Sequence, residues 1–137
     1  MSNRPFVYEL RVRYGECDPQ GIVFNANYLL YFDVAFTELW REALGAWTDM
    51  IERDGVDAVV AEANVRFRAP ARYDDVLQLQ ARIAELGETS ITTEIDVVRD
   101  GQVLVQGRLE HVFVDAETWK RTGMPDRIRS ALEPYAV

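Results

Sequence analysis

The chain has 137 residues, of which 48% are hydrophobic and 11% aromatic, so it can bury a core, and intrinsic disorder is excluded. Its 23 acidic and 15 basic residues give a net charge of −8, which disfavours general nucleic-acid binding because such a surface repels phosphate backbones. No apolar run approaches the ~20 residues that cross a bilayer, and the first residues lack an apolar signal segment. We therefore expect a cytoplasmic protein with no membrane span.

The chain contains no internal repeat, low-complexity tract or linker-like segment, which predicts a single domain over residues 1–137. Its only cysteine, Cys17, excludes an internal disulfide. Its only histidine, His111, leaves too few ligands for a Cys/His zinc site. We expect neither a metal nor a cofactor.

The first half of the chain predicts a strand followed by a long helix. Residues 6–14 are rich in β-forming side chains and predict the strand. Over residues 27–44 apolar residues recur every three or four positions and spread around most of the helix, so this helix should be buried on most sides. Asn25 or Asn27 is a candidate N-cap, and Gly45 is a candidate stop.

The second half alternates with a period of two, which is the pattern of half-buried strands. Strands are expected over residues 59–67, 77–83, 91–97 and 103–115, following one another in a meander, with short helical segments over 47–53 and 125–132. Asp100-Gly101 is a strong signal for a two-residue hairpin, and Pro125 suits the first turn of the closing helix.

This order predicts an α+β fold in which an antiparallel five-stranded sheet curves around one long central helix, with a short C-terminal helix. One helix covers only one face of such a sheet, and the strand over residues 59–67 would leave an open edge. We therefore expect a homodimer that pairs across this edge, either alone or within a homotetramer.

The segment over residues 16–28 carries the most chemistry. It places Asp18 in an Asp-Pro-x-Gly turn just before the buried helix, where backbone N–H groups are unpaired and the helix dipole is positive. Such donors stabilise an oxyanion at an ester or thioester carbonyl, and a nearby carboxylate can attack the carbon or activate water. Gly21 would let the backbone approach a ligand closely. The same residues also make ordinary turns, so the motif alone does not decide its role.

Two runs of sequence resemble the 4-hydroxybenzoyl-CoA thioesterase family of hotdog-fold proteins. They are ECDPQGIVFNANY at residues 16–28, followed by YFD at 31–33, and RAPARYDD at 68–75. The order of elements agrees with that family along almost the whole chain. The resemblance implies the hotdog fold and hydrolysis of an acyl-CoA thioester in a tunnel between two subunits. The aromatic residues around the motif suit a pocket for a short-chain or aromatic acyl group, and they suit the core equally well.

The resemblance also implies roles for individual residues. Asp18 would be the catalytic aspartate, acting either as a nucleophile through a mixed anhydride or as a general base towards water. The backbone N–H of Asn25 would point at the thioester carbonyl; many relatives carry Tyr or His there, so Asn keeps the backbone donor but changes the side chain. Gly21 and Tyr28 match positions that shape the loop and its packing, and we assign them to substrate binding together with Arg72.

Fourteen of the fifteen basic residues are arginines, a residue type suited to bidentate contact with phosphate. Five cationic residues are candidates for the phosphates of CoA, although ordinary surface ion pairs explain each of them equally well: Arg66, Arg68, Arg72, Lys120 and Arg121. His111 falls on the apolar side of its strand, which is typical of a core or interface residue whose hydrogen bonds are satisfied. Glu38 is expected to be solvated or ion-paired.

Three functions stay open from the sequence. The one that Asp18 favours is an acyl-CoA thioesterase. A thioesterase that acts on acyl groups held by acyl carrier protein would share the same site. A non-catalytic hotdog domain that binds acyl-CoA would share the fold but not the chemistry.

Overall fold

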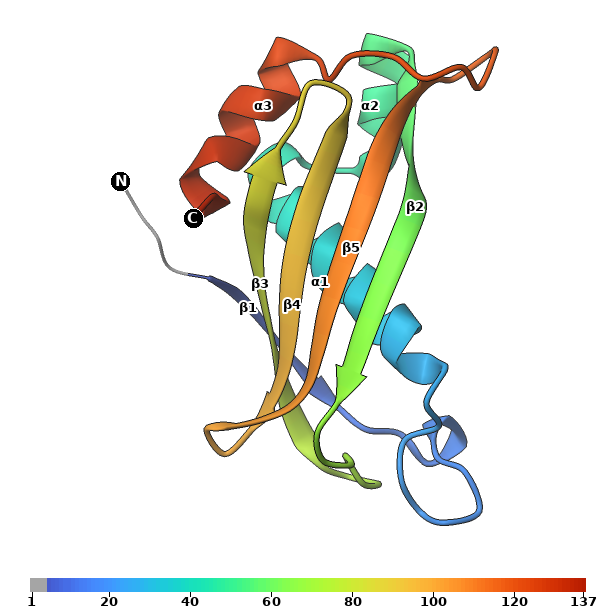
Figure 1. Ribbon diagram of the computed structural model, residues 1–137, viewed down its shortest axis with the longest axis vertical. Helices are drawn as coiled ribbons and strands as arrows, with labels where there is room; N and C mark the ends of the chain where they lie inside the picture. The colour runs from blue at the N-terminus through green and yellow to red at the C-terminus, as the bar shows by residue number, and fades with distance from the viewer. Residues whose placement is uncertain (1–4) are drawn as a thin grey trace.

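The computed structural model describes residues 5–137 as one curved sheet wrapped around a long helix (Figure 1). The strands are β1 (Phe6–Arg11), β2 (Val56–Phe67), β3 (Val76–Leu86), β4 (Ser90–Arg99) and β5 (Gln102–Asp115). The helices are α1 (Asn27–Leu44), α2 (Trp47–Asp54) and α3 (Asp126–Leu132), with single 3-10 turns η1 (Tyr14–Glu16) and η2 (Glu133–Tyr135). Within residues 5–137, no helix is both long and apolar enough to span a membrane.

The sheet is antiparallel throughout, and its strand order is β1-β3-β4-β5-β2. The expected meander of four strands is therefore wrong for its first strand: β2 lies at the far edge beside β5, and β1 takes the place beside β3. Residues 68–75, which join β2 to β3, are longer than a hairpin loop of two to five residues. They carry the chain across the end of the sheet, while the short turns after β3 and β4 keep β3, β4 and β5 adjacent.

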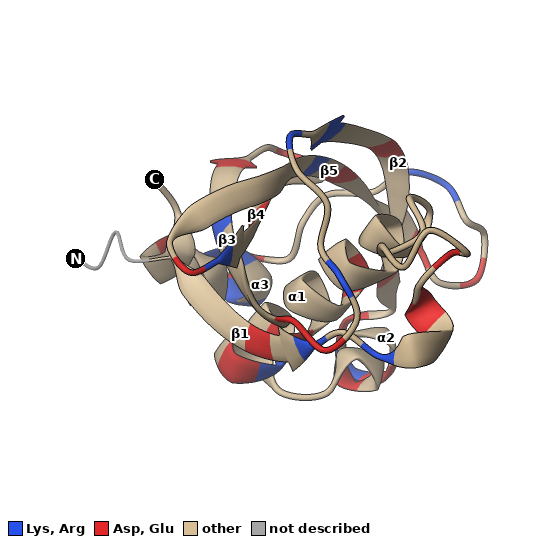
Figure 2. Ribbon diagram, turned by 90° about the horizontal axis from the view of Figure 1, so that it is seen from below, with Lys and Arg blue, Asp and Glu red and all other residues tan. Residues whose placement is uncertain are grey.

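The sheet curves around α1, which lies in the middle of the molecule when it is seen along the strands (Figure 2). The buried residues of α1 recur at helical spacing and face the sheet. They are Tyr28, Tyr31, Phe32, Ala35, Phe36, Leu39 and Trp40. The expectation that the helix is buried on most sides is not met within one chain, because Leu29 and Leu30 are 46% and 53% exposed.

The ends of the elements were predicted with mixed success. Gly45 ends α1 as expected, with φ at 87° and its N–H bonded to the Arg41 carbonyl at 3.0 Å. The predicted N-cap is wrong: Ala26 holds that position without a side-chain cap, and Asn27 donates its side-chain amide to the Glu16 carbonyl instead.

The turns between strands follow local sequence closely. Asp100 and Gly101 both have positive φ, 50° and 79°, which is the conformation of the two-residue hairpin that the dipeptide predicted. The first strand is shorter than expected: β1 ends at Arg11, because the chain leaves the sheet there and forms η1 before the motif.

Candidate active site

A cleft of about 440 Å³ opens where α1 begins and β2 ends. Its lining comes from the motif loop, from the start of α1 and from the chain that leaves β2. The lining residues are Asp18, Gln20, Ile22, Val23, Asn25, Tyr28, Phe67, Arg68, Ala69 and Pro70. The two runs singled out in the sequence, 16–28 and 68–75, thus meet at one cleft: both contribute lining residues, and the Val23 N–H donates to the Ala71 carbonyl at 2.9 Å. Both runs lie at the lower end of the sheet in Figure 1.

Asp18 is held by a tight turn that uses only one of its carboxylate oxygens. The backbone N–H of Gln20 donates to Asp18 Oδ1 at 2.8 Å, and the N–H of Gly21 donates to the Asp18 carbonyl at 2.9 Å. Gly21 has φ at 80°, a conformation that favours glycine. No donor among residues 5–137 bonds to Asp18 Oδ2, so this oxygen is available to a substrate atom.

The segment that carries Asp18 is fastened to α1 through Glu16. The Tyr31 hydroxyl donates to Glu16 Oε1 at 2.9 Å, and the Asn27 side-chain amide donates to the Glu16 carbonyl at 2.7 Å. Tyr31 is fully buried, and this burial, together with the Glu16 carboxylate, raises the pKa of Tyr31, so its hydroxyl stays a donor. These hydrogen bonds hold the loop in a fixed position relative to α1.

Asn25, two residues before the first residue of α1, lines the cleft and has a backbone N–H that is unpaired within residues 5–137. The first-turn N–H groups of Asn27, Tyr28 and Leu29 bond back to the carbonyls three residues earlier. The N–H of Asn25 has no acceptor among residues 5–137, and Asn25 lines the cleft together with Asp18. A free N–H at the positive end of a helix is suited to a carbonyl oxygen that gains negative charge.

Tyr28 joins the helix to the second wall. It is 3% exposed, its hydroxyl accepts the N–H of Ala71 at 3.3 Å, and its ring packs edge-on against Phe67 with ring centres 5.6 Å apart. Burial raises the pKa of Tyr28, which keeps the phenol neutral. Phe67 is 55% exposed, so the cleft has an apolar wall that is open to solvent in a single chain.

The loop over residues 68–75 is anchored by Asp75. Asp75 Oδ2 accepts the N–H of Arg72 at 2.8 Å and the guanidinium of Arg99 at 2.7 Å, and Arg99 also donates to the Pro70 carbonyl at 3.3 Å. Burial opposes the charge on Asp75, yet these donors and the Arg99 charge lower its pKa. The two remaining predicted substrate-binding residues, Gly21 and Arg72, lie beside the cleft but not in its lining.

The surroundings of several other titratable residues do not favour a catalytic role. Burial, followed by the charges of Glu16 and Asp18, raises the pKa of Cys17, which disfavours a thiolate nucleophile. Glu38 forms the expected ion pair, with Arg41 at 3.3 Å. Within residues 5–137, no three His, Cys, Asp or Glu side chains gather as metal ligands would.

His111 lines a second cavity, of about 280 Å³, between α1, β2 and β5. Its imidazole stacks on Phe36 with ring centres 4.1 Å apart, and it is 3% exposed. The sequence predicted a core residue with satisfied hydrogen bonds; the core position is confirmed, but Nδ1 has no partner among residues 5–137. Burial lowers the pKa of His111 to about 4, so the ring is neutral near pH 7.

Sequence reasoning missed Phe67 as a wall of the cleft. Phe67 ends β2, 49 positions after Asp18, and no motif links the two residues. Strand alternation places the Phe67 side chain on one face of the sheet but does not say which loop meets it. This contact could be predicted only if the pairing of the strands were already known.

Asp18, Asn25 with its unpaired backbone N–H, and the apolar Phe67 thus line one cleft. This arrangement is suited to polarising an ester or thioester carbonyl and adding water to it. The fold and the site together define a class of protein: hydrolases of activated acyl groups that have the hotdog fold.

Comparison with known proteins gives the family. A model of the thioesterase-like superfamily matches residues 12–132, and the chain belongs to that superfamily. The acyl-CoA thioester hydrolase YbgC of Escherichia coli O6:H1 is 32% identical over 130 residues, covering 93% of this chain and 96% of that protein. The 4-hydroxybenzoyl-CoA thioesterase of Pseudomonas sp. is 32% identical over 118 residues, covering 82% of this chain and 84% of that protein.

A crystal structure supports the same assignment at the level of the fold. A thioesterase superfamily protein from Jannaschia sp. CCS1 superposes with a TM-score of 0.90 and 27% identity, covering 100% of this chain and 99% of that one. The resemblance carried by residues 16–28 and 68–75, and the hotdog fold it implied, are confirmed.

Proposed function

We propose that this protein hydrolyses acyl-CoA thioesters to a carboxylic acid and free CoA. The observation that carries the proposal is that, within residues 5–137, Asp18, with one carboxylate oxygen free, and Asn25, with an unpaired backbone N–H, line the same cleft in a chain of the thioesterase-like superfamily. The curated relatives named above, which act on acyl-CoA and on 4-hydroxybenzoyl-CoA, support this substrate class. A short-chain or aromatic acyl group is proposed on the same ground.

In the proposed reaction the thioester carbonyl oxygen accepts the Asn25 N–H, and negative charge develops on that oxygen as the carbon is attacked. Asp18 Oδ2 either attacks the carbon, giving a mixed anhydride that water then opens, or takes a proton from a water molecule that attacks directly. In both routes the C–S bond breaks, the thiolate of CoA leaves and is protonated, and water supplies the new oxygen. A carboxylate, an N–H donor and water suffice for this chemistry, so we propose that no cofactor takes part.

We also propose that the working form is a homodimer, alone or within a homotetramer. β2 is a twelve-residue strand with a free edge, Val60 and Phe67 on it are at least half exposed, and Leu29 and Leu30 at the start of α1 are about half exposed. A second copy paired along β2 would cover these side chains and would close the cleft into a tunnel.

The test of the proposed function is Asp18→Asn, assayed on short-chain, long-chain and aromatic acyl-CoAs. We expect kcat to fall by about 10²–10⁴-fold, the usual size of acid–base catalysis, with an unchanged circular dichroism spectrum and thermal midpoint. Asp100→Asn is the matched control, because Asn also adopts the positive φ of that hairpin position.

Wild-type rates in Asp18→Asn would overturn the site. Tight binding of acyl-CoA by the wild type without turnover would instead support a non-catalytic binding domain. Faster hydrolysis of the carrier-bound acyl group in a paired assay would support an acyl-carrier-protein thioesterase.

A further inference from the structure

Trp119 is an exposed aromatic residue in a backbone conformation that bulky residues rarely adopt. Its φ is 61°, and it is 62% exposed. The other two tryptophans pack inside the molecule: Trp40 is 1% exposed, and Trp47 lies against it with ring centres 4.5 Å apart. A bulky side chain at positive φ is strained, and an exposed indole buries little apolar surface in a single chain. Such strain is found where a residue serves a binding surface.

Hydrogen bonds hold the turn that carries Trp119 in place. The Trp119 N–H donates to the Asp115 carbonyl at 2.9 Å, and the Asp115 N–H donates to the Lys120 carbonyl at 2.8 Å, which closes the turn. Asp115 Oδ1 accepts the N–H groups of Thr118 and Glu117, both at 2.9 Å. A side-chain carboxylate that caps two backbone donors stabilises a turn. The indole is therefore presented on a fixed support.

The turn lies at the end of the sheet opposite the cleft, and it projects past the free edge of β2. Asp115, where the turn begins, pairs with Val56 at the start of β2. In Figure 1 the turn between β5 and α3 extends beyond β2 at the upper right, whereas the cleft is at the lower end of the sheet. Eleven strand steps, roughly 35 Å, separate Val56 from Phe67, the residue of β2 that lines the cleft. Within one chain Trp119 is thus remote from the cleft.

A second copy paired along β2 removes this separation. Strands related by a two-fold axis run antiparallel, so a pair that uses the whole of β2 sets Val56 of one copy opposite Phe67 of the other. The projecting turn of the second copy then reaches across the β2 edge towards the cleft that holds Asp18. Phe67 is 55% exposed at this place. Trp119 of the second copy therefore meets the open apolar wall of the cleft.

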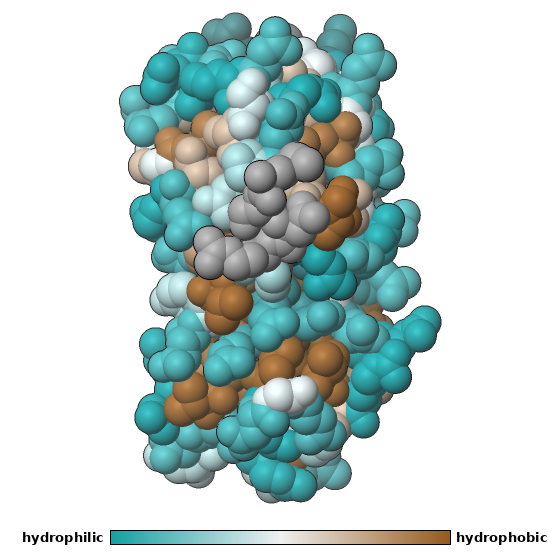
Figure 3. All heavy atoms as spheres, turned by 90° about the vertical axis from the view of Figure 1, so that its left-hand side faces the viewer, coloured by the Kyte–Doolittle hydropathy of each residue, from teal (hydrophilic) through white to brown (hydrophobic). Residues whose placement is uncertain are grey.

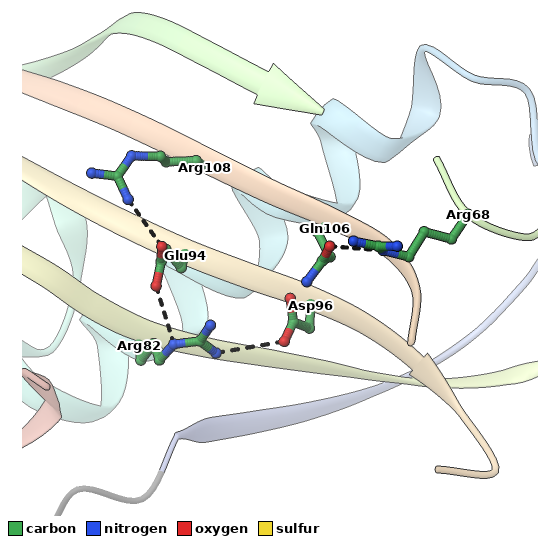
Figure 4. Close-up of polar contacts among 6 residues, drawn as sticks. All are labelled: Arg68, Arg82, Glu94, Asp96, Gln106 and Arg108. Atoms are coloured by element: carbon green, nitrogen blue, oxygen red, sulfur yellow. Dashed lines mark hydrogen bonds and ion pairs between the residues drawn. The ribbon is translucent and has the colours of Figure 1, made fainter. Parts of the chain in front are cut away.

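The outer face of the sheet, turned away from α1, is a poor surface for an indole. There Arg82 forms ion pairs with Glu94 at 3.2 Å and with Asp96 at 3.5 Å (Figure 4). Glu94 also pairs with Arg108 at 2.9 Å. An indole placed over these groups would remove water from several ions, which costs free energy. The exposed ring of Phe67 is the better counterpart, because aromatic rings pack favourably against one another.

We propose that Trp119 of each subunit packs over the Asp18 cleft of the other subunit and completes its apolar wall opposite Phe67. The inference rests on the proposed homodimer and the proposed hydrolysis, and it adds to the site a residue that comes from the second copy. Contacts made only in the dimer then offset the backbone strain at Trp119. Two aromatic rings across the interface would hold the apolar part of the substrate and exclude bulk water from the cleft.

The test places two defects on different chains. Trp119→Asn removes the indole but tolerates positive φ, so the turn should fold at least as well and the thermal midpoint should not fall. We expect kcat/KM for acyl-CoA to drop about tenfold or more, as when an aromatic anchor of an interface is truncated, and Trp119→Phe to keep most of the activity. A dimer of one Asp18→Asn chain and one Trp119→Asn chain, purified through two different tags, should recover about half of the wild-type rate, because one of its two sites is intact.

The matched control dimer carries both substitutions on one chain and neither on the other. Its only Asp18 is then covered by the chain that lacks Trp119, so its rate should fall below that of the first mixed dimer. If Trp119 acted within its own chain, the order of the two rates would be reversed. The reversed order, or equal rates, would overturn the proposal.

A second measurement is independent of hydrolysis. The emission of Trp119, taken as the difference between the wild type and Trp119→Phe, should be shielded from acrylamide in the wild-type dimer. It should be quenched readily in Leu30→Lys/Val60→Lys, which blocks the β2 surface. Equal quenching in the two proteins, or a wild-type monomer by light scattering, would overturn the proposal. If the wild type hydrolysed no acyl-CoA, the proposed function would fail, and this quenching would still decide the position of Trp119.

Discussion

His111 is a buried base whose position costs stability in acid. Its pKa is lowered by burial to about 4 in the folded chain, against about 6.5 when exposed. The unfolded chain therefore binds a proton that the folded chain does not between these two values. Stability contributed by the neutral ring is present above about pH 6.5 and is lost as the pH falls towards 4.

Replacing His111 with Gln should remove this pH dependence. A shift of this size corresponds to about 3 kcal/mol of unfolding free energy between pH 7 and pH 4. Urea unfolding at both pH values should show that His111→Gln loses less unfolding free energy between pH 7 and pH 4 than the wild type does. Equal losses in the two proteins would show that His111 protonates freely in the folded state.

At the scale of elements, the contact between α1 and β5 depends on Gly107. A Cβ at Gly107 would lie 2.4 Å from the ring of Phe32, which is fully buried on α1. Since the ring has packed neighbours on its other sides, it has little room to move away. The helix therefore sits closer to the sheet at this point than any side chain on β5 would permit.

Gly107→Ala should destabilise the protein by about 1–3 kcal/mol, the usual cost of overpacking a core. Gly15→Ala is the matched control, because nothing lies within 4 Å of a Cβ at that position and its φ is not positive. Thermal or urea unfolding measures the stability of both variants. If Gly107→Ala were as stable as Gly15→Ala, the sheet and helix would have to be free to separate.

Over the whole molecule, exposed apolar side chains gather beside the β2 edge. Leu30 on α1, Val60 on β2 and Phe67 at the end of β2 are each at least half exposed. Apolar groups also collect on the opposite side of the molecule, in the lower half of Figure 3. The twelve-residue free edge of β2 distinguishes the β2 side, so this side is the surface that a second copy is expected to cover.

Leu30→Lys combined with Val60→Lys should convert the proposed dimer into a 15.7 kDa monomer and reduce hydrolysis, since the cleft would lose its covering subunit. Val7→Lys is the control: Val7 is 50% exposed like Val60, but it lies on β1 at the other edge. Light scattering gives the native mass. A wild-type mass of 15.7 kDa in a fully active sample would rule out the shared tunnel.

Local patterns in the sequence were enough to predict most elements and the core of the candidate site. The period of two over residues 59–115 predicted four strands, and Asp100-Gly101 predicted its hairpin. Asp18 was singled out by the Asp-Pro-x-Gly turn before the helix, and Asn25 by the resemblance of residues 16–28 to a known family. Such features depend on neighbours in the chain, which a single sequence displays.

The tertiary structure alone decided which distant segments meet. It placed β2 beside β5, brought Phe67 and Arg68 to the cleft of Asp18, and left His111 Nδ1 without a partner. Alternation says that a side chain points to one face of a sheet, but not which strand lies next to it or what crosses above it. Those contacts arise from the packing of the whole chain around α1, and no pattern within a single element encodes them.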